Sequence, residues 1–392
     1  MDIYDVYSIA AAPKHTLIKR GVSMFGRDVR FKSACVFLTL LSVVVFSQQR
    51  YKDYCFESAA VEPGIVYRTA ENRGGIDTLA FDLYTPEGDQ QNLRPLVIFM
   101  HGGSFVSGSR DEDYVVEFCT EMARRGYVAA ALSYRLGTLN DDFTLMAYRA
   151  VQDSRAAVRF FRANGETYGI DTSAIICGGY SAGALTALQH VCLNDNTISQ
   201  IVDTDVHGPL DTGEYTEFSS SVSTVINYCG AVVDTLLLEG ITTPVVSIHG
   251  TDDNTVPYGA GYAFGVSIFP MLYGSGIIHP ILNSMNVENL LITAEGEAHT
   301  LLPETFAASI PQAANFIYSL LDEPSIVTSG TADRTRMRAA MRTDKGVFLH
   351  NRTLTNKTFD LRGRAISGGL RPGASAAGVY LMKTPRENNR RF

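Results

Sequence analysis

Short, continuous apolar runs alternate with helical stretches across the central part of this 392-residue chain, from residue 64 to residue 322. A run that is apolar at every position is typical of a strand buried on both faces, as in parallel sheets covered by helices. We predict strands of this kind at 95–100 and 127–133, and further strands at 174–178, 222–228, 244–249 and 287–293. We predict helices at 112–125, 145–164, 183–192, 259–272 and 304–321. The pattern therefore indicates an α/β fold with a mostly parallel central sheet and helices on both faces.

Charge is distributed unevenly along the chain. Residues 48–330 carry 34 acidic and 13 basic residues, whereas residues 331–392 carry 14 basic and 4 acidic residues. An acidic surface repels phosphate backbones, so the central part is not expected to bind nucleic acid. The change of sign after residue 330 predicts a separate carboxyl-terminal module.

The amino-terminal segment has the pattern of a secretory signal peptide. Its apolar run at 34–46 is about 13 residues long, whereas a helix that crosses a bilayer needs about 20. Three basic residues precede the run and a serine follows it, which is typical of an exported chain. We therefore expect residues 1–47 to be an extension and signal peptide, with Met24 as an alternative start to Met1. The other interpretation is a strand or helix of the core.

The rest of the chain is expected to form three parts. A catalytic domain is predicted over 48–322 and a linker rich in turn residues over 323–345. Short strand-like pieces separated by glycines follow at 346–392, and they predict a small all-β module.

Six cysteines occur in the chain. Cys35 lies in the apolar run at 34–46 and would be removed with it. The odd number that remains allows at most two disulfides in an exported chain, with the pairing left open. Cys177 lies in an apolar strand pattern and is expected to be an inert buried thiol. No CxxC spacing occurs, so no cysteine-based metal site is predicted. The remaining cysteines are Cys55, Cys119, Cys177, Cys192 and Cys229.

The pentapeptide Gly179-Tyr-Ser-Ala-Gly183 predicts a serine nucleophile at Ser181. A nucleophilic serine on a sharp strand-to-helix turn needs small neighbours two residues before and after it, because backbone and helix crowd there. A strand is predicted before this pentapeptide and a helix after it. By composition alone roughly 0.2 such matches arise per chain by chance, so an ordinary turn is the alternative.

A second motif, His101-Gly-Gly-Ser-Phe105, follows the predicted strand at 95–100. Consecutive glycines allow backbone N–H groups to approach a ligand oxygen, as in an oxyanion hole. We expect Gly102 and Gly103 to donate from this side and the amide of Ala182 from the other. A plain glycine turn is the alternative.

The segment His249 to Tyr258 follows another predicted strand and contains two adjacent carboxylates, Asp252 and Asp253. A carboxylate at a strand end can orient a histidine and stabilise its cation. We choose Asp253, because related motifs usually read HGxxD. A calcium loop is the competing interpretation, but the alternating acidic ligands of an EF-hand are missing.

His299 lies in a loop between the last predicted strand and the last predicted helix. It is placed to take the proton from Ser181 and return it to a leaving alcohol. The chain order is then serine, aspartate, histidine, which is the order found in α/β-hydrolases.

On these motifs, residues 62–322 resemble the α/β-hydrolase superfamily, in the carboxylesterase branch with an HGG oxyanion segment. Tyr134-Arg135 and the segment Val151 to Ala157 also resemble that branch. Within the latter segment we expect Asp153 and Arg155 to be structural ion-pair partners. The resemblance implies the α/β-hydrolase fold and a Ser181–His299–Asp253 triad that needs no metal and no organic cofactor.

The carboxyl-terminal tail carries its own resemblance. Its segments 359–364 and 377–383 resemble the two halves of a type IX secretion sorting domain, which addresses exported bacterial proteins to the outer membrane. The resemblance implies an outer-membrane secretion machinery as partner and a location outside the cell or on its surface. A carbohydrate-binding or stabilising β-module is the alternative.

Together these features predict a secreted serine carboxylesterase that removes acetyl or feruloyl groups from plant cell-wall polysaccharide such as acylated xylan or its oligosaccharides. The pocket wall is expected to include Phe105, Tyr180 and Tyr258. Two enzymatic alternatives are a prolyl-oligopeptidase-like serine peptidase and a short-chain lipase. A hydrolase fold that binds without catalysis is the alternative from another class.

Overall fold

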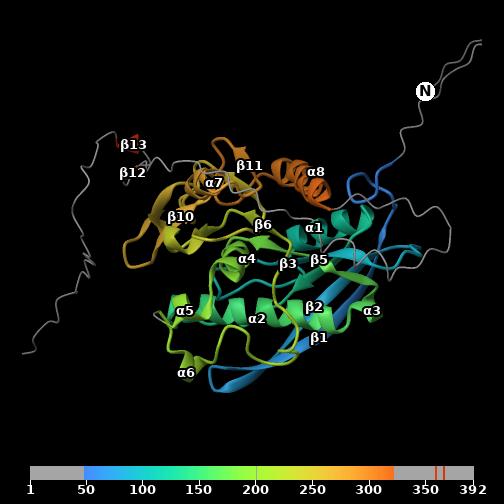
Figure 1. Ribbon diagram of the computed structural model, residues 1–392, viewed down its shortest axis with the longest axis horizontal. Coiled ribbons are helices and arrows are strands. Elements are labelled where there is room, and N and C mark those ends of the chain that lie inside the picture. The colour runs from blue at the N-terminus through green and yellow to red at the C-terminus, as the bar shows by residue number, and fades with distance from the viewer. Residues whose placement is uncertain (1–47, 200, 322–357, 360–364, 367–392) are drawn as a thin grey trace, which may run out of the picture. The chain divides into compact units, whose positions relative to one another are not determined.

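The computed structural model describes residues 48–321 except residue 200, together with 358–359 and 365–366. A central sheet of eight strands runs through the described core (Figure 1). The first two strand pairs in the spatial order, β1–β2 and β2–β4, are antiparallel, and all the others are parallel. In spatial order the strands are β1 (Ala59–Asn72), β2 (Gly75–Pro86), β4 (Val128–Leu132), β3 (Arg94–Met100), β5 (Ile170–Tyr180), β6 (Thr224–Tyr228), β8 (Val245–Gly250) and β11 (Asn289–Ala294).

The central strands are apolar because both of their faces are covered. Every residue of β4, β6 and β8 is buried, and so is every residue of β3 after Arg94. All six predicted strands are present within a few residues of their expected bounds, and the edge strand β11 is only half-buried over most of its length. The prediction of an α/β fold with a mostly parallel sheet is therefore confirmed.

Helices cover both faces of the sheet and divide the core into two apolar clusters. One cluster is formed with α1 (Asp113–Arg124) and α8 (Pro303–Leu320), and the other with α2 (Phe143–Ala163), α4 (Ala182–Cys192) and α7 (Ser275–Ser284). In Figure 1, α1 and α8 lie on one side of the sheet and α2 and α4 on the other. No helix in the described part of the chain is long and apolar enough to cross a membrane.

The helix predicted at 259–272 is wrong. This segment instead contains β9 (Ala260–Tyr262), the short 3-10 turn η2 (Ala263–Gly265) and β10 (Met271–Gly274), and the helix α7 begins only afterwards. β10 pairs with β9 and with β7 (Ala231–Val232) in a small second sheet. The segment is rich in glycine and contains Pro270, which cannot donate a backbone hydrogen bond, and such residues favour turns over a continuous helix.

The remaining described elements are short. Between residues 193 and 221, where no regular structure is predicted, the chain forms two one-turn helices. The short elements are α3 (Gly165–Tyr168), α5 (Asp195–Ile198), α6 (Thr204–His207) and the 3-10 turn η1 (Thr235–Leu238).

Several predictions for the chain ends lie outside the described residues. These are the signal peptide at 1–47, the linker at 323–345 and most of the module at 346–392. Within that module the structure describes one antiparallel pair, β12 (Thr358–Phe359) with β13 (Ala365–Ile366).

The cysteines of the described core do not form the disulfides that an exported chain allows. All five are free thiols, and four of them are buried. Cys177 fits its prediction, because burial raises the pKa of its thiol to about 12 and keeps it protonated.

A buried ion pair ties the start of the sheet to α2. The Asp153 side chain is fully buried, and its carboxylate oxygens lie 2.9 Å from Arg68 Nη1 and 2.9 Å from Arg135 Nε. It also accepts the backbone N–H of Arg135. Asp153 is therefore a structural ion-pair residue, as predicted, and two cations share its carboxylate. Arg155 also forms an ion pair, but with Asp211 at 3.1 Å and not with Asp153.

Replacing Asp153 by Asn should lower the free energy of unfolding by about 3–5 kcal/mol, because two buried guanidinium groups lose their counter-charge. Urea denaturation at pH 7 measures the change. Asp113→Asn, at an exposed position in the first turn of α1, is the control and should cost less than about 1 kcal/mol. A loss below about 1 kcal/mol for Asp153→Asn would contradict this account.

Candidate active site

Ser181 sits at a sharp turn between β5 and α4. Its backbone has φ 55° and ψ −117°, a conformation that L-residues rarely adopt. A Cβ added at Gly179 would lie 2.5 Å from the carbonyl carbon of Gly183, and one added at Gly183 would overlap the backbone of Met100. Both glycines of the pentapeptide are therefore required by close backbone packing.

The structure brings the three predicted side chains into one hydrogen-bonded chain. His299 Nε2 lies 2.8 Å from Ser181 Oγ, and His299 Nδ1 lies 2.7 Å from Asp253 Oδ2. Ser181, Asp253 and His299 follow the carboxyl ends of β5, β8 and β11, respectively. These ends lie at the same edge of the sheet because the strands are parallel. With Asp253 ionised, Nδ1 is the donor and Nε2 is free to accept a proton from the serine.

The structure distinguishes the two adjacent carboxylates. Asp253 is buried, with 4% of its surface exposed, whereas Asp252 is exposed to solvent. Asp253 Oδ1 accepts the backbone N–H groups of Thr255 and Val256 at 2.8 and 2.9 Å. Burial opposes ionisation of Asp253, but hydrogen bonds from His249 and His299 outweigh it and lower its pKa to about 2. Asp253 is therefore an anion near neutral pH.

A second histidine, His249, supports the same carboxylate. It is fully buried on β8, and its Nε2 lies 2.9 Å from the carbonyl oxygen of Val256 and 3.2 Å from Asp253 Oδ2. Both neighbours are acceptors, so Nε2 carries a hydrogen. The sequence motifs do not assign this role to His249, although its position four residues before Asp253 is a signal for it.

The glycine segment after β3 differs from expectation at one position. The N–H of Gly102 donates to the hydroxyl of Tyr114 at 2.7 Å, so it is not available as an oxyanion donor. Gly103 has φ 110°, and Ala182 is the first residue of α4, where backbone N–H groups have no partner within the helix. The amides of Gly103 and Ala182 are the remaining candidates, and Tyr114, on α1, was missed because no local motif marks it.

Beside Ser181 lies a cavity of about 20 Å³, which has room for little more than one water molecule. Most of its wall is apolar, and Phe105 and Phe143 meet edge to face there with ring centroids 5.2 Å apart. The lining residues are Ser104, Phe105, Phe143, Ser181, Ala182, Leu185, Thr255, Val256, Ala263, Phe264 and Leu272.

Phe105 thus lies where the sequence predicted, whereas Tyr180 and Tyr258 do not line the cavity. The Tyr180 hydroxyl donates to the carbonyl oxygen of His299 at 2.7 Å and accepts the N–H of Leu301 at 3.0 Å. Tyr258 packs edge to face against His249. Tyr180 therefore holds the loop that carries His299. Tyr258 instead packs against the histidine that supports Asp253.

One group of side chains in the described part of the chain has ligand atoms close enough to hold a metal ion: Cys229, His249 and Asp253. The donors do not fit this role. Burial raises the pKa of the Cys229 thiol to about 12, and His249 Nε2 is occupied by two acceptors. A metal needs a thiolate and a free imidazole nitrogen. Within this cluster His249 therefore acts as a support of Asp253, and the Cys229 thiol lies next to the Tyr180 hydroxyl.

Comparison with known proteins gives a family match over part of the chain, and similar esterases. A family model described as BD-FAE matches residues 81–240. Gut esterase 1 of Caenorhabditis elegans is 31% identical over 121 residues, which cover 29% of this chain and 21% of that protein. Juvenile hormone esterase of Tribolium castaneum is 26% identical over 147 residues, which cover 36% of this chain and 22% of that protein. The chain thus spans about a fifth of the length of these curated relatives.

Among solved structures, Thermogutta terrifontis esterase 2 phosphoramylated by tabun is similar, with a TM-score of 0.51 and 22% identity over 68% of this chain and 96% of that one. The same esterase phosphorylated by paraoxon gives a TM-score of 0.50, with 69% of this chain and 97% of that one covered. The chain has the α/β-hydrolase fold. The family match and the esterase relatives support an α/β-hydrolase of the carboxylesterase type.

In this α/β-hydrolase, the depressed pKa of Asp253 ties stability to pH. Its ordinary value of 3.8 falls to about 2 on folding, which stabilises the folded state by about 2 kcal/mol above pH 4–5. This contribution is lost as pH falls from about 4 toward 2. Asp253→Asn should therefore be at least about 2 kcal/mol less stable than the parent at pH 7, and the gap should narrow below pH 4.

Urea denaturation between pH 7 and pH 3 measures this gap. Asp252→Asn, at the exposed neighbouring position, should show almost no gap at any pH. A gap for Asp253→Asn that stays constant across this pH range would contradict the assignment of the shifted carboxylate.

Proposed function

We propose that the protein is a serine carboxylesterase with Ser181 as nucleophile, His299 as general base and then acid, and Asp253 as the group that orients the histidine. The observation that carries the proposal is the continuous hydrogen-bonded chain from Ser181 Oγ through His299 to Asp253. A buried anion at one end of such a chain stabilises the imidazolium that forms when the serine loses its proton.

In the proposed reaction, Ser181 Oγ attacks the ester carbonyl while His299 Nε2 takes its proton. The tetrahedral intermediate collapses when His299 returns that proton to the leaving alcohol, and an acyl-serine remains. Water then attacks the acyl group with His299 again acting as base, which releases the acid and restores Ser181.

The negative oxygen of the intermediate would be stabilised by the amides of Gly103 and Ala182. Support comes from their placement, because Gly103 follows the end of β3 and Ala182 begins α4, on either side of Ser181. Backbone N–H groups at a helix start carry a partial positive charge that favours an anion.

The small cavity supports a short acyl group. Its volume of about 20 Å³ suits the methyl group of an acetate, which is close in size to one water molecule. A feruloyl ring or a long fatty chain would have to displace Phe105, Phe143 or their neighbours. Of the acyl groups considered from the sequence, acetyl is therefore favoured over feruloyl, and the long chains of interfacial lipids are disfavoured.

The alcohol part of the ester and the location of the protein are proposed as well. Acetylated xylan or its oligosaccharides are proposed as substrates of an enzyme that acts outside the cell. The signal-peptide pattern at 1–47 supports export, and the tail motifs within 346–392 support contact with an outer-membrane secretion machinery. A neutral, acylated polysaccharide is also compatible with the acidic charge of residues 48–330.

Ser181→Ala should lower kcat for p-nitrophenyl acetate by a factor on the order of 10⁶, because it removes the hydroxyl that forms the acyl intermediate. Ser284→Ala is the control, since that hydroxyl lies at the exposed end of α7 and bonds only its own helix. If Ser181→Ala keeps more than about a tenth of the parent rate, the esterase assignment fails and a non-catalytic binding role for the fold becomes the better account.

Acyl specificity tests the size of the cavity. The parent should prefer p-nitrophenyl acetate and acetylated xylan over p-nitrophenyl octanoate and methyl ferulate. Phe143→Ala should raise the octanoate-to-acetate ratio of kcat/KM by about tenfold or more, since each methylene it admits to an apolar site gains about 0.8 kcal/mol.

The matched control is Phe316→Ala, a half-buried phenylalanine on α8 that is not part of the cavity wall. It should leave the ratio unchanged. A parent enzyme that prefers octanoate or ferulate esters would refute the assignment of this cavity as an acetyl site.

A further inference from the structure

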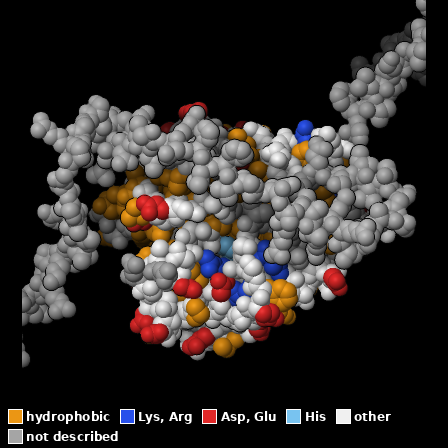
Figure 2. All heavy atoms as spheres, in the orientation of Figure 1, with side chains coloured by type: hydrophobic (Ala, Val, Ile, Leu, Met, Phe, Trp, Pro, Cys, Tyr) orange, Lys and Arg blue, Asp and Glu red, His pale blue; other side chains and the backbone are white. Residues whose placement is uncertain are grey.

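A second, larger cavity lies away from Ser181, beside α2. Its volume is about 450 Å³, within the range of small-molecule sites. Residues from β1, the β1–β2 turn, the loop after β4, α2 and α6 line it. Figure 2 shows basic side chains gathered beside a histidine in the lower half of this face, with acidic side chains around them.

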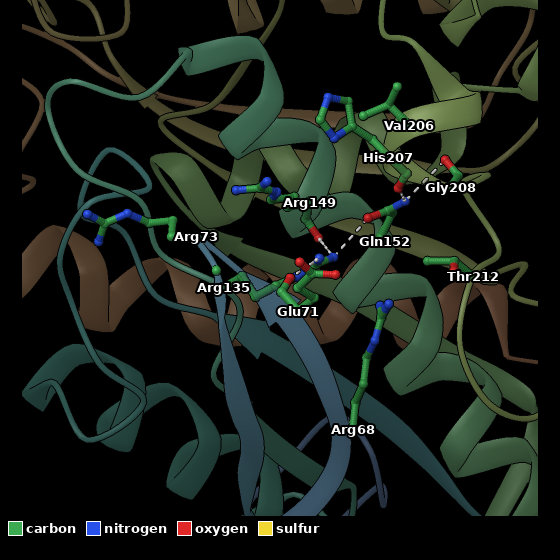
Figure 3. A pocket seen from close by; sticks show the side chains of 11 residues that line it. Arg68, Glu71, Arg73, Arg135, Arg149, Gln152, Val206, His207, Gly208 and Thr212 are labelled. Atoms are coloured by element: carbon green, nitrogen blue, oxygen red, sulfur yellow. Dashed lines mark hydrogen bonds between the residues drawn. The ribbon is translucent and has the colours of Figure 1, made fainter.

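Four arginines line this cavity: Arg68, Arg73, Arg135 and Arg149. In the close-up of Figure 3 they come from different elements, and the side chain of Arg73 extends away from the other three. Arg135 is fully engaged, because its guanidinium bonds Asp153, Gln152 and two backbone carbonyls. It therefore serves as a fixed wall of the cavity.

Arg68 has donor capacity that the protein does not use. Its Nη1 bonds Asp153, and no bond from its Nη2 is found in the described part of the chain. Its Nε also has no partner, but it is buried against Gly213 and out of a ligand's reach. Burial lowers the pKa of Arg68; Asp153 opposes that shift, and the neighbouring Arg135 adds to it. A guanidinium with unused donors beside a second cation gains from an anionic acceptor.

Arg149 is also only partly engaged. Its Nη1 bonds the amide oxygen of Asn72 at 3.1 Å, and no carboxylate of the described chain lies within 4.0 Å of its guanidinium. The acidic groups at this cavity are Glu71 in its wall, Asp153 behind Arg68 and Arg135, Asp141, which pairs with Arg73 at 3.3 Å, and Glu214, which acts on Arg68. None of them pairs with Arg149, so its guanidinium is left without a direct counter-charge.

We propose that this cavity binds a carboxylate or phosphate group of a small molecule, held by Arg68 and Arg149. A planar guanidinium presents paired N–H donors that match two oxygens of such a group. The volume admits a molecule about the size of a sugar acid or a sugar phosphate. Although residues 48–330 are acidic overall, the Arg149 guanidinium has no carboxylate within 4.0 Å in the described part of the chain, so an anion can pair with it.

The site is separate from the proposed catalytic centre but connected to it through α2. Phe143 lines the small cavity beside Ser181, and Arg149 lies six residues further along the same helix, which corresponds to a rise of about 9 Å. The anion can therefore be a substituent of a long substrate or a separate small molecule. The proposal does not depend on esterase activity.

Isothermal titration calorimetry on the full chain carrying Ser181→Ala tests the site without turnover. Sodium glucuronate is the carboxylate probe and inorganic phosphate is the second probe, each titrated at low salt and pH 7. We expect saturable binding of at least one probe, and Arg149→Gln should weaken it by about tenfold or more, the usual effect of losing a hydrogen bond to a charged group. Arg149→Lys should recover part of the affinity, since it keeps the charge but not the paired donors.

Arg124→Gln is the matched control, because it removes the same charge from α1, where Arg124 pairs with Glu121. It should change the affinity by less than about twofold. Tighter glucuronate binding would identify an acidic sugar as the ligand, and tighter phosphate binding a phosphorylated one; both support the site. No binding of either probe up to about 20 mM, or binding that Arg149→Gln leaves unchanged, would overturn it.

Discussion

The buried charge of Asp253 is the constraint on which the proposed site depends. A carboxylate with so little exposure is stable as an anion only when donors surround it. Two backbone amides and two histidines supply them. One histidine comes from β8 itself and the other from the loop after β11, so the charge is held only if these neighbouring parallel strands keep their register.

The same edge of the sheet presents the serine under strain. Ser181 keeps its unusual backbone angles because β5 and α4 pack tightly around it, with glycines where any side chain would collide. Tyr180 lies next to Ser181 in the chain, yet it bonds the backbone at His299 and Leu301. The turn that carries the nucleophile and the loop that carries the base are therefore held to each other as well as to the sheet.

Much of this arrangement could be predicted from the sequence, for physical reasons. Strands buried on both faces can be recognised in the sequence because they are almost entirely apolar. The nucleophile turn can be recognised because close packing requires glycine at 179 and 183. The choice of Asp253 over Asp252 agrees with their burial. The predictions failed where a partner is distant in sequence: nothing near Gly102 indicates that Tyr114 takes its N–H, and nothing near Tyr258 shows that it faces His249. The helix expected at 259–272 failed because apolar residues spaced by glycines fit short strands equally well.

The most direct test of the central claim is to identify the residue that a fluorophosphonate probe modifies, by peptide mass spectrometry. The account predicts a single adduct, on Ser181, and a large fall in labelling rate when His299 is replaced by Ala. Labelling at another residue, no labelling of the folded protein, or a rate that is unchanged without the imidazole would contradict the proposed chain from serine to histidine to aspartate.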